Sequence, residues 1–394
     1  MRRPTLDYLR TESGSGLVLA AAAVAGLGVA NSRLGGDYFQ LLAMPVPVRV
    51  GDLTETLTLA GWVRALLMPV FFTVLGMELK FEVLRGELSN PRRLALPALA
   101  ALGGFLVPAA IYLAFNQGHG GDLAGWPIGC ATDGAAALAA LAIAGRRLPH
   151  ALHVLVMSVA LVDNLAAVSL TAILDNRALD PDMLIGAGAV LAMLALLSRW
   201  RTAPFLFYAA GFVAVWVFTL KSGLDPALGG VACAFTVPVG ARRPGQASLL
   251  KYFMESLHPY VAFLVLPIFV FAAAGFSHRA VRLADLATPG ALGLMLALVI
   301  GKPLGAFGLP FAATLLKLVR RPIGATWRQM LGVAALCGVG FTISYFIAGM
   351  PVAPKPAIQL AILLGSVASA LVGAWLLGFG NTRGDLRDAP PELI

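Results

Sequence analysis

Long apolar stretches alternate with short polar ones along almost the whole chain. A helix needs about 20 apolar residues to cross the hydrocarbon core of a bilayer. We count about twelve such stretches, centred near residues 15–31, 60–79, 94–115, 124–144, 151–174, 182–198, 203–220, 224–240, 256–275, 288–314, 326–350 and 357–380. Because a membrane span must satisfy its backbone polar groups internally, the pattern predicts an all-α polytopic membrane protein with about 12 transmembrane helices.

The composition supports this class. Of the 394 residues, 59% are hydrophobic and only 12% are charged, so a soluble fold could not cover its surface with polar side chains. We therefore expect one integral membrane unit over residues 1–394 and no separate soluble domains. The first span follows Met1-Arg2-Arg3 and resembles a signal peptide, but the many later spans favour a signal anchor.

The positions of the basic residues explain the net charge of +9. If the N-terminus is inside and the spans alternate, most of the 29 Lys and Arg residues fall in inside segments. This bias is the positive-inside rule, and it predicts that both termini are cytoplasmic and that the protein needs no nucleic-acid partner. Cys130, Cys233 and Cys337 all lie in apolar spans, so we expect no disulfide framework.

One segment, at about residues 43–61, breaks the helical pattern. Val46, Val48 and Val50 alternate with other residues, Gly51-Asp52 can form a turn, and leucines follow among threonines. This pattern predicts a short β-hairpin on the outer face. An isolated hairpin is marginally stable, so it should pack on the membrane domain or pair with a second copy of the chain.

Among the ionisable side chains inside predicted spans, four stand out: Glu78, Asp133, Asp163 and Lys302. Each costs at least about 2.5–3.5 kcal/mol on insertion scales, so each is a candidate functional residue. The alternative is a structural ion pair or a side chain that reaches the interface, and for Glu78, near a helix end, both interpretations stay open. A buried Asp and Lys would lower each other's desolvation cost, and their protonation would be coupled to any cation that enters. This is the chemistry of a cation/proton exchanger.

Glycines cluster in two of the predicted spans and predict that each of these helices is interrupted. The stretch GWPIGCATDG covers residues 125–134, and LCGVGFTIS covers 336–344. Glycine inside a helix costs about 1 kcal/mol relative to alanine, although it can also serve close helix packing. Two similar interruptions predict an inverted repeat, with core repeats at about 94–174 and 288–380, interface helices elsewhere, and two discontinuous helices that cross at mid-membrane. Asp133 would then face the N-terminal end of one half-helix and Lys302 the C-terminal end of another, with Asp163 beside the crossing.

Several segments together resemble one family, the bacterial NhaA sodium/proton antiporters, from about residue 12 to 380. The matching segments are ANS (30–32), FFTVLGMELKFEVLRGEL (71–88), GGFLVPAAIYLAFN (103–116), ATDGAAALAALAI (131–143), VMSVALVDNLAAV (156–168), LHPYVAFLVLPIFVFAAAG (257–275), IGKPLG (300–305) and LCGVGFTISYFIA (336–348). The resemblance implies a twelve-helix inverted-repeat fold, a homodimer joined partly through the outer hairpin, and a bacterial inner-membrane location. It also implies exchange of two protons for each Na⁺ or Li⁺, with no cofactor.

The resemblance assigns roles to individual positions. The ion-binding and transport residues would be Asp163, Asn164, Thr132, Asp133 and Lys302, of which Asp163, Asn164 and Thr132 would bind Na⁺ transiently. The candidates for pH sensing would be Glu78, Glu82 and Glu255.

The chain also departs from the family pattern. Asn164 stands where the family has the second aspartate of an Asp-Asp pair. Phe81 replaces an arginine of many members, Asp225 replaces a histidine of several, and Glu255 comes one place later than expected. An asparagine oxygen can bind a hard cation but carries no charge and does not titrate, so at most the one proton of the Asp163–Lys302 pair could be exchanged per site.

Three hypotheses remain from the sequence. The first is an antiporter with altered affinity or stoichiometry, and the second is a transport-impaired membrane protein with a regulatory or sensing role. The third, an intramembrane hydrolase, lacks a GxGD motif and a buried Ser–His set at suitable spacing. The retained Asp133, Asp163 and Lys302 favour the first hypothesis, because a chain without transport has no physical need for these buried charges.

Overall fold

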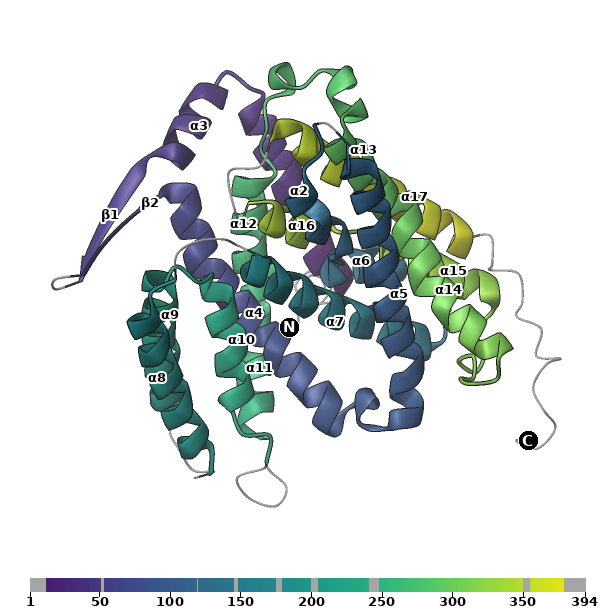
Figure 1. Cartoon of the computed structure of the whole chain (residues 1–394), viewed down its shortest axis with the longest axis horizontal. Helices are drawn as coiled ribbons and strands as arrows, with labels where there is room; N and C mark the ends of the chain where they lie inside the picture. The colour runs from purple at the N-terminus through teal and green to yellow at the C-terminus, as the bar shows by residue number, and fades with distance from the viewer. Residues whose placement is uncertain are drawn as a thin grey trace, which may run out of the picture.

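The computed structural model describes residues 12–50, 53–118, 120–144, 148–174, 179–199, 205–240, 248–349 and 355–378. Helices make up most of this part of the chain (Figure 1). The α-helices are α2 Glu12–Ala30, α3 Gly35–Ala43, α4 Leu59–Arg85, α5 Pro91–Asn116, α6 Gly134–Ala144, α7 His150–Leu174, α8 Pro181–Arg199, α9 Phe205–Lys221, α10 Pro226–Thr236, α11 Leu249–Tyr260, α12 Leu266–Ala273, α13 Pro289–Leu296, α14 Lys302–Leu315, α15 Trp327–Leu336, α16 Phe341–Ala348 and α17 Pro356–Gly378.

Six short helical elements join or interrupt these helices. Four are 3-10 helices: η1 Glu87–Ser89, η2 Leu123–Cys130, η4 His278–Ala280 and η5 Leu283–Ala287. Two are π-helical turns, η3 Val261–Val265 and η6 Ala297–Gly301, and each lies inside a longer helix. The turn η3 links α11 to α12, and η6 links α13 to α14.

The described helices are long and apolar enough for a polytopic membrane protein. Eight of them can cross a bilayer by length and composition, or up to ten if each of two bent helix pairs counts as one span. Two further apolar helices, α9 and α10, are shorter. The predicted class, an all-α integral membrane protein, is confirmed.

Glycines allow the closest helix contacts in the fold. A Cβ atom built on Gly103 of α5 would lie 2.1 Å from the carbonyl oxygen of Gly305 in α14, and one built on Gly305 would lie 2.0 Å from the oxygen of Gly103. The two backbones therefore touch through reciprocal glycines. In the absence of a hydrophobic force between helices in lipid, such close approach is a main source of packing energy. It brings α14, which begins with Lys302, against α5.

The predicted hairpin is confirmed as a two-stranded antiparallel sheet of β1 (Pro45–Val50) and β2 (Leu53–Thr58). Its register pairs Pro45 with Thr58 and Val50 with Leu53, and its turn at 51–52 lies outside the described residues. In Figure 1 the hairpin projects away from the helices. The base is held by the Trp62 indole, which donates to the Val46 carbonyl at 2.8 Å.

An ion pair joins three helices near the start of α4. One Arg64 nitrogen lies 2.7 Å from Asp225 Oδ2, and the other donates to the carbonyl of Gly349, the residue that follows α16. The guanidinium also lies over the Phe346 ring, 4.8 Å from its centroid. Asp225 caps α10 by accepting from the Ala227 N–H, so Arg64 ties the end of α16 to the beginning of α10.

Candidate functional site

Two helices are interrupted in the interior, and the interruptions meet. The 3-10 helix η2 ends at Cys130 and α6 begins at Gly134, with a bend of 42° between them. The second interruption separates α15 from α16 at residues 337–340. The Asp133 N–H donates to the Val339 carbonyl at 2.6 Å, which joins the two breaks directly. Both breaks lie within the glycine-rich stretches that the sequence marked.

Asp133 stabilises the N-terminal ends of two helices. Its Oδ1 accepts from the Ala136 N–H in the first turn of α6 at 3.1 Å. Its Oδ2 accepts from the Thr342 N–H at 3.0 Å and from the Thr342 hydroxyl. A carboxylate is favourable at a helix N-terminus because of the unpaired N–H groups and the helix dipole. The sequence placed Asp133 at one half-helix, and the structure places it at both.

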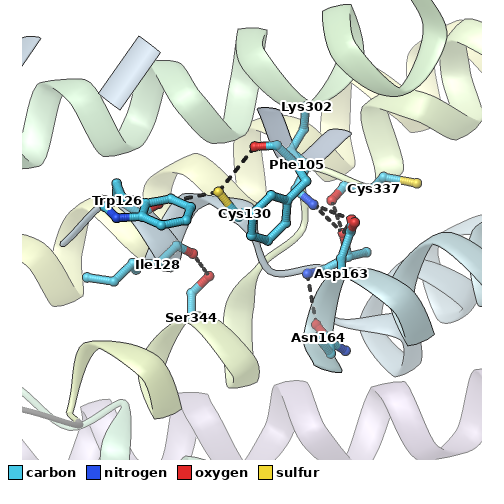
Figure 2. Close-up of polar contacts among 10 residues, drawn as sticks. Phe105, Trp126, Ile128, Cys130, Asp163, Asn164, Lys302, Cys337 and Ser344 are labelled. Atoms are coloured by element: carbon cyan, nitrogen blue, oxygen red, sulfur yellow. Dashed lines mark hydrogen bonds and ion pairs between the residues drawn. The ribbon is translucent and has the colours of Figure 1, made fainter. Parts of the chain in front are cut away.

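Asp163 and Lys302 form an ion pair that is fully buried. The Lys302 ammonium lies 2.5 Å from Asp163 Oδ2, and both side chains are 0% exposed. Figure 2 shows the lysine from α14 and the aspartate from α7 pointing toward one another. Nothing in the described part of the chain donates a hydrogen bond to the second oxygen, Asp163 Oδ1. One carboxylate oxygen therefore remains available to a cation without disruption of another hydrogen bond.

Thr132 connects this pair to the breaks. Its hydroxyl accepts from the Lys302 ammonium at 2.9 Å and lies 2.9 Å from the Cys337 carbonyl and 3.1 Å from Asp163 Oδ2. A hydroxyl has one proton, so it donates to only one of these two oxygens at a time. The Cys337 carbonyl lies at the end of α15, and Lys302 contacts this helix end through Thr132 rather than directly.

Asn164 lies next to the pair through its amide oxygen. The oxygen accepts from the Thr132 N–H at 3.1 Å, and the side chain is buried. An amide oxygen has two lone pairs, so it can bind a cation while it keeps this hydrogen bond. The oxygens of Asp163, Asn164 and Thr132 thus lie around one small region, and oxygen ligands of this kind suit hard cations such as Na⁺ and Li⁺.

A cavity leads to this region between α5 and α7. Its volume is about 270 Å³, and Asp163 and Ser158 are the polar residues among those that line it. Leu88 of η1 and Phe105 of α5 lie on its wall. Residues of η1 and of α7, including Asp163, therefore line the same cavity.

Comparison with known proteins decides the family. Residues 6–377 match the family model described as Na+/H+ antiporter 1. The chain belongs to this antiporter family. It is 42% identical over 381 residues to Na(+)/H(+) antiporter NhaA 2 of Pseudomonas syringae, an alignment that covers 96% of this chain and 95% of the relative. It is 41% identical over 377 residues to Na(+)/H(+) antiporter NhaA of Campylobacter concisus, with 95% and 92% covered.

A third relative, Na(+)/H(+) antiporter NhaA 1 of Pseudomonas putida, is 40% identical over 371 residues, which is 93% of each chain. Membership of the antiporter family, together with the apolar helices, makes this chain an integral membrane transporter and not an enzyme. The ions that an antiporter moves are its substrates rather than cofactors.

The three pH-sensing candidates of this antiporter lie on other helices. Glu78 and Glu82 are one turn apart on α4, and both are partly buried. Glu255 is exposed on α11, where Lys251 lies 3.7 Å from it. Phe81, beside Glu82, packs against the main hydrophobic core.

Several buried hydroxyl groups that link helices around the two breaks were not predicted from the sequence. Ser344 donates to the Ile128 carbonyl at 2.8 Å and so links α16 to η2, as Figure 2 shows. Ser366 of α17 accepts from the Phe341 N–H at 3.1 Å, and Ser369 donates to the Leu298 carbonyl at 3.2 Å. Serines in an apolar span suggest close helix packing, and only the folded chain identifies the carbonyl or N–H group that each one bonds.

Proposed function

We propose that this protein exchanges Na⁺ or Li⁺ for H⁺ across the bacterial inner membrane through the Asp163–Lys302 pair. The observation that carries the proposal is a buried carboxylate with one oxygen on the lysine and the other without a donor among the described residues. A cation that enters has a charged oxygen to bind, and its binding weakens the attraction between Asp163 and Lys302.

Competition between the cation and the lysine couples the two ions. When a cation binds Asp163, the Lys302 ammonium loses its counter-charge while its side chain remains 0% exposed. An unpaired buried charge is costly, so the lysine releases its proton. When the cation leaves, protonated lysine pairs with Asp163 again. One cation therefore replaces one proton.

We propose that Asn164 stands where most of the family has a second aspartate. Its amide oxygen, together with Thr132 and Asp163, would bind the cation transiently, but it adds no charge and no titrating proton. The consequence is weaker attraction for the cation than in a site with two carboxylates, and a cycle that exchanges one proton and moves no net charge.

For the fold we propose twelve spans in an inverted repeat, with both termini cytoplasmic. The eight long helices, the two bent pairs and the shorter α9 and α10 together support the number. The reciprocal contact between Gly103 and Gly305, and the contact between the two breaks through Asp133, support the repeat, because equivalent elements would meet at its axis. In this arrangement the repeats are at about 94–174 and 288–380.

We further propose a homodimer that forms partly through the hairpin. Strands β1 and β2 make a sheet with exposed edges, and such edges are templates for pairing with another chain. Glu78, Glu82 and Glu255 remain proposed sites of pH regulation. Their positions on α4 and α11, outside the two repeats, suit a role in regulation better than a role in cation binding.

The experiment is exchange by the purified protein in sealed liposomes. A pH gradient is imposed, Na⁺, Li⁺ or K⁺ is added in turn, and internal pH is followed. We expect a pH change with Na⁺ and Li⁺ that Asp163→Asn abolishes. Asp182→Asn, an exposed aspartate in the first turn of α8, is the matched control and should exchange as the wild type does.

Two results would contradict the proposal. The first is no pH change with any cation from correctly inserted wild-type protein, which favours a regulatory or sensing role. The second is full activity of the Asp163→Asn protein, which would place the transport site elsewhere.

A further inference from the structure

The helix that carries Lys302 is π-helical in the turn just before it. The Lys302 N–H donates to the carbonyl of Ala297, five residues back, instead of to Leu298, four residues back. The next residue, Pro303, has no N–H. The Leu298 carbonyl therefore receives no hydrogen bond from Lys302 or from Pro303, the two positions that would supply one within its own helix.

A side chain from another helix supplies the missing donor. The Ser369 hydroxyl, on α17, donates to the Leu298 carbonyl at 3.2 Å. Leu298 is 0% exposed and Ser369 is 1% exposed, so water does not serve either group. A buried carbonyl without a donor costs about 1–3 kcal/mol, so this hydrogen bond stabilises the π turn.

Two glycines pack closely around Leu298 and its carbonyl group. A Cβ atom on Gly338, in the break between α15 and α16, would lie 2.3 Å from the Leu298 oxygen and 2.7 Å from Ser369 Oγ. A Cβ on Gly365 of α17 would lie 2.9 Å from Cδ1 of Leu298. The absence of side chains at these glycines lets α17 and the break approach the turn, so that Ser369 reaches it.

We propose that Ser369 is a positioning residue for Lys302. Its hydroxyl holds η6 in the π conformation, and this conformation directs the Lys302 ammonium to Asp163 and Thr132. The inference rests on the proposed exchange mechanism, in which the strength of the Asp163–Lys302 pair sets how easily a cation replaces the proton.

The alternative conformation of η6 is an ordinary α-helical turn. Without the serine, the Leu298 carbonyl can recover a donor if the turn becomes α-helical and the Lys302 N–H bonds to it. A π turn contains one residue more than the α-helical turn that replaces it, and an α-helix turns by about 100° per residue. Conversion of η6 from π-helical to α-helical would therefore rotate Lys302 by about 100° relative to α13. The ammonium would then no longer align with Asp163, and the ion pair would weaken.

The test compares Ser369→Ala with two other α17 variants. Ser369→Cys keeps a weak donor of similar size and should restore part of the wild-type behaviour. Ser366→Ala removes a buried hydroxyl one turn away, which bonds α16 and not η6. This variant therefore shows what the loss of a buried serine hydroxyl does when the π turn is left intact. Exchange is measured in liposomes as a function of pH and of Na⁺ concentration.

We expect Ser369→Ala to exchange at lower pH and with a half-maximal Na⁺ concentration about fivefold lower, the factor that corresponds to one ordinary hydrogen bond. A misaligned lysine competes less well with Na⁺ for Asp163. Ser366→Ala should lower only the maximal rate. Unchanged pH and Na⁺ dependence in Ser369→Ala would overturn the inference.

A crystal structure of Ser369→Ala separates this inference from the transport proposal. We expect the Lys302 N–H to bond Leu298 and the ammonium to leave Asp163. If the π turn and the 2.5 Å contact persist, Ser369 does not position the lysine, whether or not the protein transports. If the turn changes while the wild-type protein does not exchange ions, the positioning role stands and the transport proposal fails.

Discussion

Removal of one member of the Asp163–Lys302 pair leaves the other buried without a counter-charge. At the observed 2.5 Å, and with an effective dielectric constant of about 20, the attraction between the charges is about 7 kcal/mol. Desolvation of the two ions opposes it by several kcal/mol per ion, so the intact pair contributes little net stability. A lone buried charge has no such compensation and costs about 3–5 kcal/mol.

A double-mutant cycle measures this difference. We expect Asp163→Asn and Lys302→Met each to lower the free energy of unfolding by about 3–5 kcal/mol, and the double variant to lie within about 1–2 kcal/mol of the wild type. The free energy of unfolding is measured in detergent micelles by intrinsic tryptophan fluorescence. Asp182→Asn, on the exposed surface of α8, is the control and should change it by less than about 0.5 kcal/mol.

Additive losses would refute the reasoning. If the double variant is destabilised by the sum of the single variants, the two charges do not compensate each other. If Asp163→Asn is as stable as the wild type, the lysine is not confined to its buried position beside residue 163.

Three further predictions concern the surroundings of the pair. Asn164→Asp adds a carboxylate beside Asp163 and should lower the half-maximal Na⁺ concentration by about tenfold, measured by Na⁺ titration in liposomes; an unchanged value would exclude this side chain from the cation site. Asp133→Ala leaves the buried Thr342 N–H and the partly buried Ala136 N–H without an acceptor and should lower the free energy of unfolding by about 1–4 kcal/mol in the same fluorescence assay, whereas a neutral effect would contradict the capping role. Gly305→Ala would place a Cβ 2.0 Å from a backbone oxygen of α5 and should lower the thermal midpoint of unfolding, while Gly308→Ala on the same helix meets no atom within 4 Å and should not; equal effects would argue against the close contact.

The sequence predicted the charged centre of the site because charged residues are rare in membrane-spanning helices. Asp163 and Lys302 stand out in apolar spans, and their pairing follows from the cost of each charge alone. The helix interruptions were visible for a similar reason, since glycine is unfavourable inside a helix unless something requires it. In both cases a local violation of the membrane pattern was enough.

The polar partners of the breaks could not be predicted. Thr342 bonds Asp133 across 209 residues of sequence, and Ser369 bonds Leu298 across 71. Serine and threonine are ordinary in membrane helices, where they often bond their own backbone, so neither residue differs from its neighbours in the sequence. The π turn before Lys302 was equally hidden, because the donor to its Leu298 carbonyl comes from α17.

The coupling ratio tests the central claim most directly. Liposomes that contain the protein are given opposing Na⁺ and H⁺ gradients, with the membrane potential fixed by K⁺ and valinomycin, and the gradient ratio that stops net exchange is determined at several potentials. One cation for one proton predicts that exchange stops when the two gradients are equal, at every potential. A balance point that moves with potential, as required for two protons per cation, would contradict exchange through a site with a single carboxylate and a single lysine.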